Sequence, residues 1–325
     1  MIAPDGTVYV DNTILRCAAS CSLHTVLRHV LHQRNSETGA ALRAGTAAHE
    51  ALAAYFTSLA KRQPPDTSVA LGLAAFAEHY EQWANENVLN EDRLAFSNLH
   101  PIMSEWMETR HSTALPFFCA DPNEVEVGFA YPLDESGKYV FFWRIDLIGH
   151  SRHDGKWYIV DHKTTGRIDQ FWAGSFRLDT QVTGYLWAAL QHNPDVQGVY
   201  INGLEFRKLN SSDTKCRVHG MSYADCRLAP EHLKFEVAGP IHRTVEQMER
   251  WRVNALALAQ KYEHYALNFA NFDLLQYAEM EGPFTNACRF CDFQEFCSLG
   301  QHPEQLPALG FVYDEWMPYN PLEVA

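Results

Sequence analysis

Three residues on two adjacent apolar segments have side chains that can bind a metal ion and activate water. Asp146 lies in the segment 143–149, and Asp161 and Lys163 lie in the segment 157–165, with a polar turn between the two segments. Side chains two residues apart in a strand point to the same face, so Asp161 and Lys163 share one face. Two carboxylates and an ammonium group are costly to bury unless they act together. The hairpin therefore predicts a site for a divalent metal ion and a phosphate.

The residue types suit hydrolysis of a phosphodiester bond. That reaction requires a Lewis acid, an activated water molecule and stabilisation of the leaving oxygen, and Mg²⁺ and Mn²⁺ favour carboxylate and carbonyl oxygens. We expect Asp146, Asp161 and the backbone carbonyl of His162 to bind the metal. Lys163 would orient the attacking water or stabilise negative charge, and Glu126 is a further candidate carboxylate. The alternative is an exposed hairpin with ordinary surface charges, which the apolar residues around these side chains disfavour.

The elements that would position these side chains follow from hydrophobic periodicity. Residues 13–110 show helical periodicity in several segments, with breaks near 35–39, 63–65 and Pro101. The remaining expected elements are strands over 124–131, 139–149, 157–163, 198–206 and 233–237, helices over 175–191 and 245–268, and a loop over 208–230. This order indicates an α/β core wrapped by a helical N-terminal region.

Length and composition limit the class of protein. The chain has 325 residues, of which 46% are hydrophobic, enough for one elaborated domain with a substantial core. Neither a membrane span nor a signal peptide is recognisable, so we expect a cytoplasmic protein with no membrane contact. The net charge of −14 argues against a general DNA-coating protein, which should be basic. It is compatible with an enzyme that binds DNA in a focused groove.

The order of Asp146 and then Asp161-His162-Lys163 resembles that of the PD-(D/E)XK nuclease superfamily, and more closely its RecB-like exonuclease branch. The resemblance implies a restriction-endonuclease-like mixed β-sheet core flanked by helices, and DNA hydrolysis with Mg²⁺ or Mn²⁺. Two positions depart from the common pattern. Trp143-Arg144 stands where many relatives have Gly-Arg, and His162 stands where Tyr or Phe is commoner. Neither departure removes a group that the reaction requires.

Three shorter elements extend this resemblance. Gly45 and His49 match a Gly-x-x-x-His element on an N-terminal helix, whose histidine helps to bind the metal. Gln181 and Tyr185 match a Gln-x-x-x-Tyr element on the helix after the active hairpin, where a spacing of four places both on one helix face. Glu126 occupies the place of an extra acidic residue before the first aspartate. A lone histidine on an apolar helix is more often a packing residue, so the order and spacing of the elements carry the weight.

A cysteine motif near the C-terminus predicts a second metal centre. Cys288, Cys291 and Cys297 form C-x2-C-x5-C, and such pairs bind zinc or an iron–sulfur cluster with a fourth ligand from elsewhere. The motif resembles that of the AddB-type helicase–nuclease subunits and the CRISPR-adaptation nucleases, in which one cysteine before the core joins three after it. The resemblance implies a [4Fe–4S] cluster with Cys21 as the N-terminal ligand, or Cys17, one helical turn away. A structural Zn²⁺ site is the alternative.

The other cysteines are expected to have no such role. Disulfides are rare in a reducing compartment, so none is expected among the eight cysteines. Cys119, Cys216 and Cys226 are scattered, and we interpret them as ordinary buried or loop thiols.

The predicted organisation has four parts. Residues 1–115 form a helical region that contributes one cluster cysteine and the Gly-x-x-x-His element. Residues 116–240 form the nuclease core, residues 241–300 form the long helix and the cysteine segment, and residues 301–325 form an acidic tail.

The leading hypothesis is a metal-dependent exonuclease or single-strand DNase acting on single-stranded DNA or free ends, in recombination, repair, phage or CRISPR-adaptation processing. Without a phosphate-binding loop of the helicase type, unwinding would need a helicase or a recombination or adaptation partner. The alternatives are a structure- or sequence-specific endonuclease, and a catalytically idle nuclease-like DNA-binding or assembly subunit.

Overall fold

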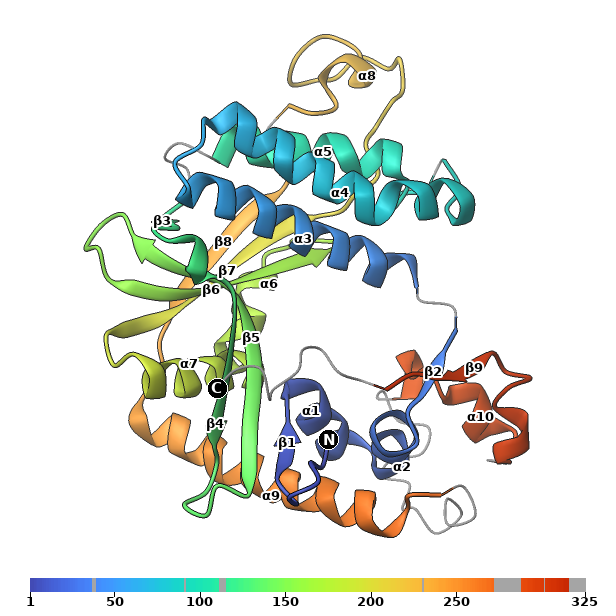
Figure 1. Ribbon diagram of the computed structural model, residues 1–325. Coiled ribbons are helices and arrows are strands. Elements are labelled where there is room, and N and C mark those ends of the chain that lie inside the picture. The colour runs from blue at the N-terminus through green and yellow to red at the C-terminus, as the bar shows by residue number, and fades with distance from the viewer. Residues whose placement is uncertain are drawn as a thin grey trace.

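The computed structural model describes residues 1–36, 39–90, 92–110, 115–229, 231–271, 288–300 and 302–315. Within these residues, a seven-stranded mixed sheet forms the centre of the molecule (Figure 1). Its strands are β1 Val8–Val10, β3 Phe117–Phe118, β4 Val125–Pro132, β5 Tyr139–Ser151, β6 Trp157–Thr165, β7 Val196–Glu205 and β8 Phe235–Ile241. The order is β1-β5-β6-β7-β8, with β3 and β4 also paired to β5. The predicted fold class, a mixed sheet flanked by helices, is confirmed.

The N-terminal region is helical, as predicted. Its elements are α1 Asn12–Ser20, α2 Ser22–Thr25, the π-helical turn η1 Val26–Val30, α3 Ala40–Ala60, α4 Pro65–Asn87 and α5 Phe96–Arg110. The expected break at 63–65 separates α3 from α4, which begins at Pro65, where proline fits the first turn of a helix. The break expected at Pro101 is wrong, because α5 continues through this residue. Pro101 lies in the second turn of α5, so the helix loses only one backbone hydrogen bond there.

The remaining helical elements follow the hairpin of β5 and β6, apart from one short turn before it. They are η2 Pro122–Glu124, α6 Trp172–Ser175, η3 Phe176–Leu178, α7 Thr180–His192, α8 Tyr223–Cys226, α9 Val245–Asn268, η5 Cys288–Phe290, α10 Gln294–Ser298 and η6 Pro303–Gln305. The connection through α7 makes β6 and β7 parallel neighbours. The helix begins at Thr180 because the Asp179 carboxylate accepts hydrogen bonds from the backbone N–H groups of Gln181 (2.6 Å) and Val182 (3.2 Å).

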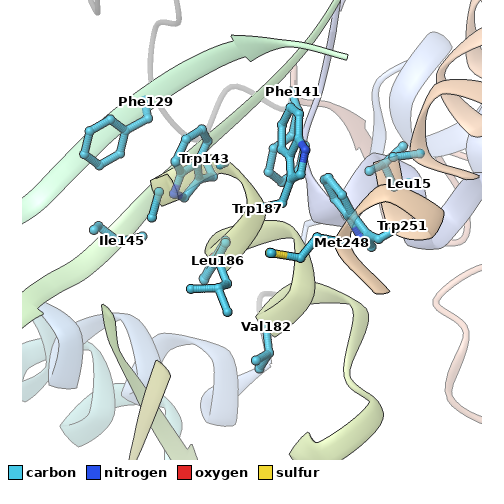
Figure 2. Packing of buried hydrophobic residues seen from close by; sticks show 14 of the residues in the cluster. Leu15, Phe129, Phe141, Trp143, Ile145, Val182, Leu186, Trp187, Met248 and Trp251 are labelled. Atoms are coloured by element: carbon cyan, nitrogen blue, oxygen red, sulfur yellow. The ribbon is translucent and has the colours of Figure 1, made fainter. Parts of the chain in front are cut away.

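Helices cover both faces of the sheet (Figure 1). On one face, α7 and α9 pack aromatic side chains against β5, and Figure 2 shows Phe141, Trp143, Trp187 and Trp251 meeting there. On the other face, helices α3 to α5 bury a second cluster that includes Trp106. Burial of these two apolar layers is the main force that fixes the sheet between its helices. None of the helices that the structure describes has the length and apolar character needed to cross a bilayer.

The two ends of the described chain lie side by side. Strand β2 (Gln33–Asn35) pairs antiparallel with β9 (Phe311–Tyr313), and a third hydrophobic cluster joins α2 and η1 to α10. Asp314 forms ion pairs with Arg28 (3.6 Å) and Arg34 (3.1 Å). Residues 311–314 of the predicted acidic tail are therefore held against the N-terminal region, while residues 301 and 316–325 of that tail lie outside the described residues.

Candidate active site

The two aspartates of the hairpin lie where β5 and β6 stop pairing. The ladder between these strands ends at Leu147 and Val160, and Asp146 and Asp161 are the next residues along each strand. Lys163 follows on the same face of β6 as Asp161. The hairpin thus brings together the three charged side chains that the sequence singled out, at the point where the ladder between β5 and β6 stops.

Asp146 is held by groups from two other parts of the chain. Its Oδ1 lies 3.2 Å from His49 Nδ1, and its Oδ2 accepts a hydrogen bond of 2.6 Å from the backbone N–H of His162. Gly45 lets α3 approach the sheet, because an added Cβ would lie 3.1 Å from Thr164 Oγ1. Although burial opposes both shifts, the charge of Asp146 raises the pKa of His49 to about 9, and His49 lowers the pKa of Asp146.

Glu126 completes a compact group of ligand atoms. The candidate ligand atoms of His49, Glu126 and Asp146 all lie within 4.8 Å of one another. Glu126 has a φ of 53°, in the left-handed region that non-glycine residues rarely adopt, and its carboxylate lies 2.8 Å from Arg144 Nε. Burial and the nearby charge of Asp146 raise the pKa of Glu126 to about 7. Three ligand groups from α3, β4 and β5 therefore converge on one point.

Lys163 links Asp161 to helix α7. Its ammonium group lies 2.8 Å from Asp161 Oδ2 and donates a hydrogen bond of 3.1 Å to Gln181 Oε1. Gln181 in turn donates through Nε2 to the Tyr185 hydroxyl, at 2.7 Å. Burial lowers the pKa of Lys163, but the charge of Asp161 outweighs it and the net shift is upward. Asp161 is therefore ion-paired with Lys163 and is not part of the group of ligand atoms formed by His49, Glu126 and Asp146.

The His162 side chain is buried in the core, where its ring lies edge-to-face with that of His49 at a centroid separation of 6.2 Å. Its ring stacks on Phe56 with a centroid separation of 5.5 Å, and its Nδ1 lies 2.8 Å from Asn202 Nδ2. Burial lowers its pKa to about 4, so the ring is neutral near pH 7. This side chain is a packing group, and only the backbone of His162 is available to the site, as the predicted use of its carbonyl requires. Asn202 was not identified from the sequence, because nothing local marks an asparagine in a strand as a partner of a histidine 40 residues earlier.

The structure also gathers the cysteines of the predicted cluster. Burial, followed by the neighbouring thiols of Cys291, Cys21 and Cys288, raises the pKa of Cys297 to about 11. Among the described residues, these four do not bring their sulfur atoms within 4.8 Å of one another as a group. The structure thus places the four predicted cysteines near one another.

Two other cysteines are not the scattered thiols that the sequence indicated. Cys216 and Cys226 lie beside His219 and His232 in the loop between β7 and β8, with ligand atoms within 4.8 Å of one another. The spacing C-x2-H-x6-C-x5-H was the available signal, and counting histidines together with cysteines would have found it. Cys119 has no part in this group.

One comparison with known proteins agrees with these observations. Residues 12–298 match the family described as the PD-(D/E)XK nuclease superfamily. No curated protein matches the chain. A solved structure described as "Crystal structure of SSO0001" has 15% sequence identity over 54% of this chain and a TM-score of 0.28. The match covers 59% of that structure's chain, less than two thirds of its length.

Proposed function

Since the chain belongs to the PD-(D/E)XK nuclease superfamily, we propose that it is a metal-dependent DNA exonuclease or single-strand DNase of the RecB-like type. The observation that supports this most directly is the convergence of His49, Glu126 and Asp146 beside the ion pair of Asp161 and Lys163. Burial of charged groups costs folding free energy, and clusters of buried groups with shifted pKa values are found most often at functional sites.

The chemistry of the donor set suits a divalent cation. Asp146, Glu126 and His49 would hold the ion, with Asp161 and the His162 carbonyl as further ligands. Oxygen donors suit Mg²⁺ and Mn²⁺, and the imidazole of His49 favours Mn²⁺ over Mg²⁺. When bound, the ion polarises the phosphate and lowers the pKa of a water molecule.

Lys163 would act on the reacting groups from a fixed position. Its ammonium group is held from one side by Asp161 and from the other by Gln181, whose amide is oriented by the Tyr185 hydroxyl. Burial raises the pKa of Tyr185 well above its usual value, so the hydroxyl keeps its proton. A preorganised ammonium group can orient the attacking water and stabilise negative charge on the phosphate in the transition state.

Labelled DNA tests the proposal directly. Pure protein is incubated with end-labelled and end-blocked single- and double-stranded DNA, in Mg²⁺, Mn²⁺ or EDTA. We expect metal-dependent release of nucleotides from free ends, faster with Mn²⁺ and abolished by EDTA. Equal cleavage of end-blocked DNA would establish the endonuclease alternative. DNA binding without cleavage in any metal would contradict the proposal and favour the idle subunit.

Metal binding should weaken as the pH falls. Metal ligands must lose their protons, and the pKa values of His49 (about 9) and Glu126 (about 7) place both titrations in an accessible range. Each displaced proton weakens the apparent affinity roughly tenfold per pH unit below the pKa of its group. We expect the Mn²⁺ dissociation constant, measured from the EPR signal of free Mn²⁺, to rise as pH falls below about 9, and more steeply below about 7.

The Glu126→Gln variant separates the two titrations. The amide of Gln does not titrate in this range. The steeper pH dependence of the Mn²⁺ dissociation constant below pH 7 should therefore disappear, while the pH dependence due to His49 remains. An Mn²⁺ dissociation constant that is the same at all pH values in the parent protein would show that neither residue binds the metal.

We propose, in addition, that Cys21, Cys288, Cys291 and Cys297 hold a [4Fe–4S] cluster. Supporting this, Cys21 and the three later cysteines lie at the contact between the two ends of the described chain, next to the third hydrophobic cluster. Cys17 is less suited, because Cys21 and not Cys17 packs with Cys291 and Cys297 against the third hydrophobic cluster. The cluster would then join the helical N-terminal region to the segment after the nuclease core.

Iron and sulfide analysis under anaerobic conditions tests the cluster. We expect brown protein with four irons per chain, as the cluster type requires, and loss of the iron in Cys291→Ser but not in the control Cys119→Ser. Zinc in place of iron, lost in the same variant, would establish the structural zinc alternative. Colourless protein without iron or zinc at these cysteines would reject both, and leave the nuclease proposal intact.

A further inference from the structure

The connection between β7 and β8 is a long loop that carries α8 and projects beyond α4 and α5 (Figure 1). Apart from α8, its described backbone is held by turns and by an isolated bridge between Lys215 and Ser222. Val218 and Met221 are 65% and 48% exposed, so the end of the loop buries little apolar surface. A loop of this length with so little core requires another source of order.

Four side chains of this loop meet at one point. Cys216 Sγ lies 3.6 Å from His219 Nδ1 and 3.3 Å from His232 Nε2, and Cys226 Sγ lies 3.4 Å from His232 Nε2. The two cysteines are buried and the two histidines are half-buried. The four residues come from a turn, from the end of α8 and from the segment that leads into β8, so no single element accounts for their approach.

The separations match those around a tetrahedral zinc ion. Zinc binds thiolates at about 2.3 Å and imidazoles at 2.0–2.1 Å, which places neighbouring ligand atoms roughly 3.3–3.8 Å apart. The measured separations of 3.3, 3.4 and 3.6 Å fall in this range. Two sulfur and two nitrogen ligands in a tetrahedral arrangement are a donor set that zinc prefers.

The surroundings also resemble those of a metal site. His219 offers Nδ1 to the group, and its other ring nitrogen, Nε2, lies 3.1 Å from Glu231 Oε2, as when a carboxylate orients a metal-binding histidine. Gly220, with a φ of 72°, allows the tight turn between Cys216 and Met221.

We infer that Cys216, His219, Cys226 and His232 bind a structural Zn²⁺ ion. With four protein ligands the coordination sphere is closed, which excludes a catalytic role for the ion. The ion fixes the loop between β7 and β8 by joining residues up to 16 positions apart, in place of a hydrophobic core. This site is separate from the proposed DNA-cleaving site and from the predicted iron–sulfur cysteines.

Zinc analysis of the full-length protein tests the inference. We expect Cys216→Ser and His232→Asn to contain one zinc ion per chain fewer than the parent protein, and the control Cys119→Ser to retain it. The iron content, measured in the same samples, should be equal in all of them. A parent protein without zinc, or zinc content unaffected by both site variants, would overturn the inference.

Two measurements on the parent protein do not depend on whether the variants fold. Zinc X-ray absorption should show nitrogen as well as sulfur ligands, and a shell of sulfur alone would contradict the site. Removal of zinc by a chelator should increase trypsin cleavage after Lys215 and Arg217 at least about tenfold, because the loop loses the ion that joins Cys216 and His219 to Cys226 and His232. Cleavage that is equal with and without zinc would show that the ion does not order this loop.

Discussion

The Asp161→Asn variant is expected to cleave DNA at least about a thousandfold more slowly than the parent protein, a loss of about 4 kcal/mol of transition-state stabilisation. The substitution keeps the size of the side chain but removes its charge. Lys163 then loses the partner that lies 2.8 Å away, and the proposed metal site loses one carboxylate. The initial rate of nucleotide release, in saturating Mn²⁺, measures the effect.

Asp195→Asn is the matched control. Asp195 is exposed immediately before β7, and the same chemical change there should leave the rate within about twofold, as surface substitutions away from a site usually do. An Asp161→Asn protein that is folded and cleaves as fast as the parent would remove this aspartate from the proposed mechanism. Lys163→Met should show a comparable loss of rate, since it removes the ammonium group from the same pair.

The Trp251→Ala variant is expected to lower the free energy of unfolding by about 3–5 kcal/mol. Trp251 on α9 is only 8% exposed, and its ring lies 4.9 Å from that of Phe141 and 5.4 Å from that of Trp187 (Figure 2). The Trp251 ring also packs on Gly184, because a Cβ added to Gly184 would lie only 2.4 Å from the ring. Removing the ring leaves a cavity between α7, α9 and β5. Urea unfolding followed by circular dichroism measures the change.

Val253→Ala, on the same helix, is the control. Val253 is 53% exposed, so its truncation should change the stability by less than about 0.5 kcal/mol. Gly184→Ala should also be destabilising, because the new methyl group meets the Trp251 ring rather than empty space. If Trp251→Ala and Val253→Ala unfold at the same urea concentration, the packing of α7 on α9 does not hold the fold together.

Much of the fold could be predicted because its signals are local. The long strands β5, β6 and β7 and helix α9 lie close to their predicted ranges, since each is long enough to show its hydrophobic period. Strands β1, β2, β3 and β9 were not predicted, because two or three residues cannot show a period. The continuation of α5 through Pro101 was missed because tertiary packing of the helix outweighs the loss of a single hydrogen bond.

The sequence by itself determined which residue types the site contains and their order along the chain. Asp146, Asp161 and Lys163 are in neighbouring strands, where a period of two decides which side chains share a face. Only the tertiary structure decided which groups touch. His49 lies 97 residues from Asp146, and Cys216 lies 16 residues from His232 across an irregular loop. Such contacts depend on how helices and loops pack on the sheet, and no periodic pattern in the chain encodes that packing.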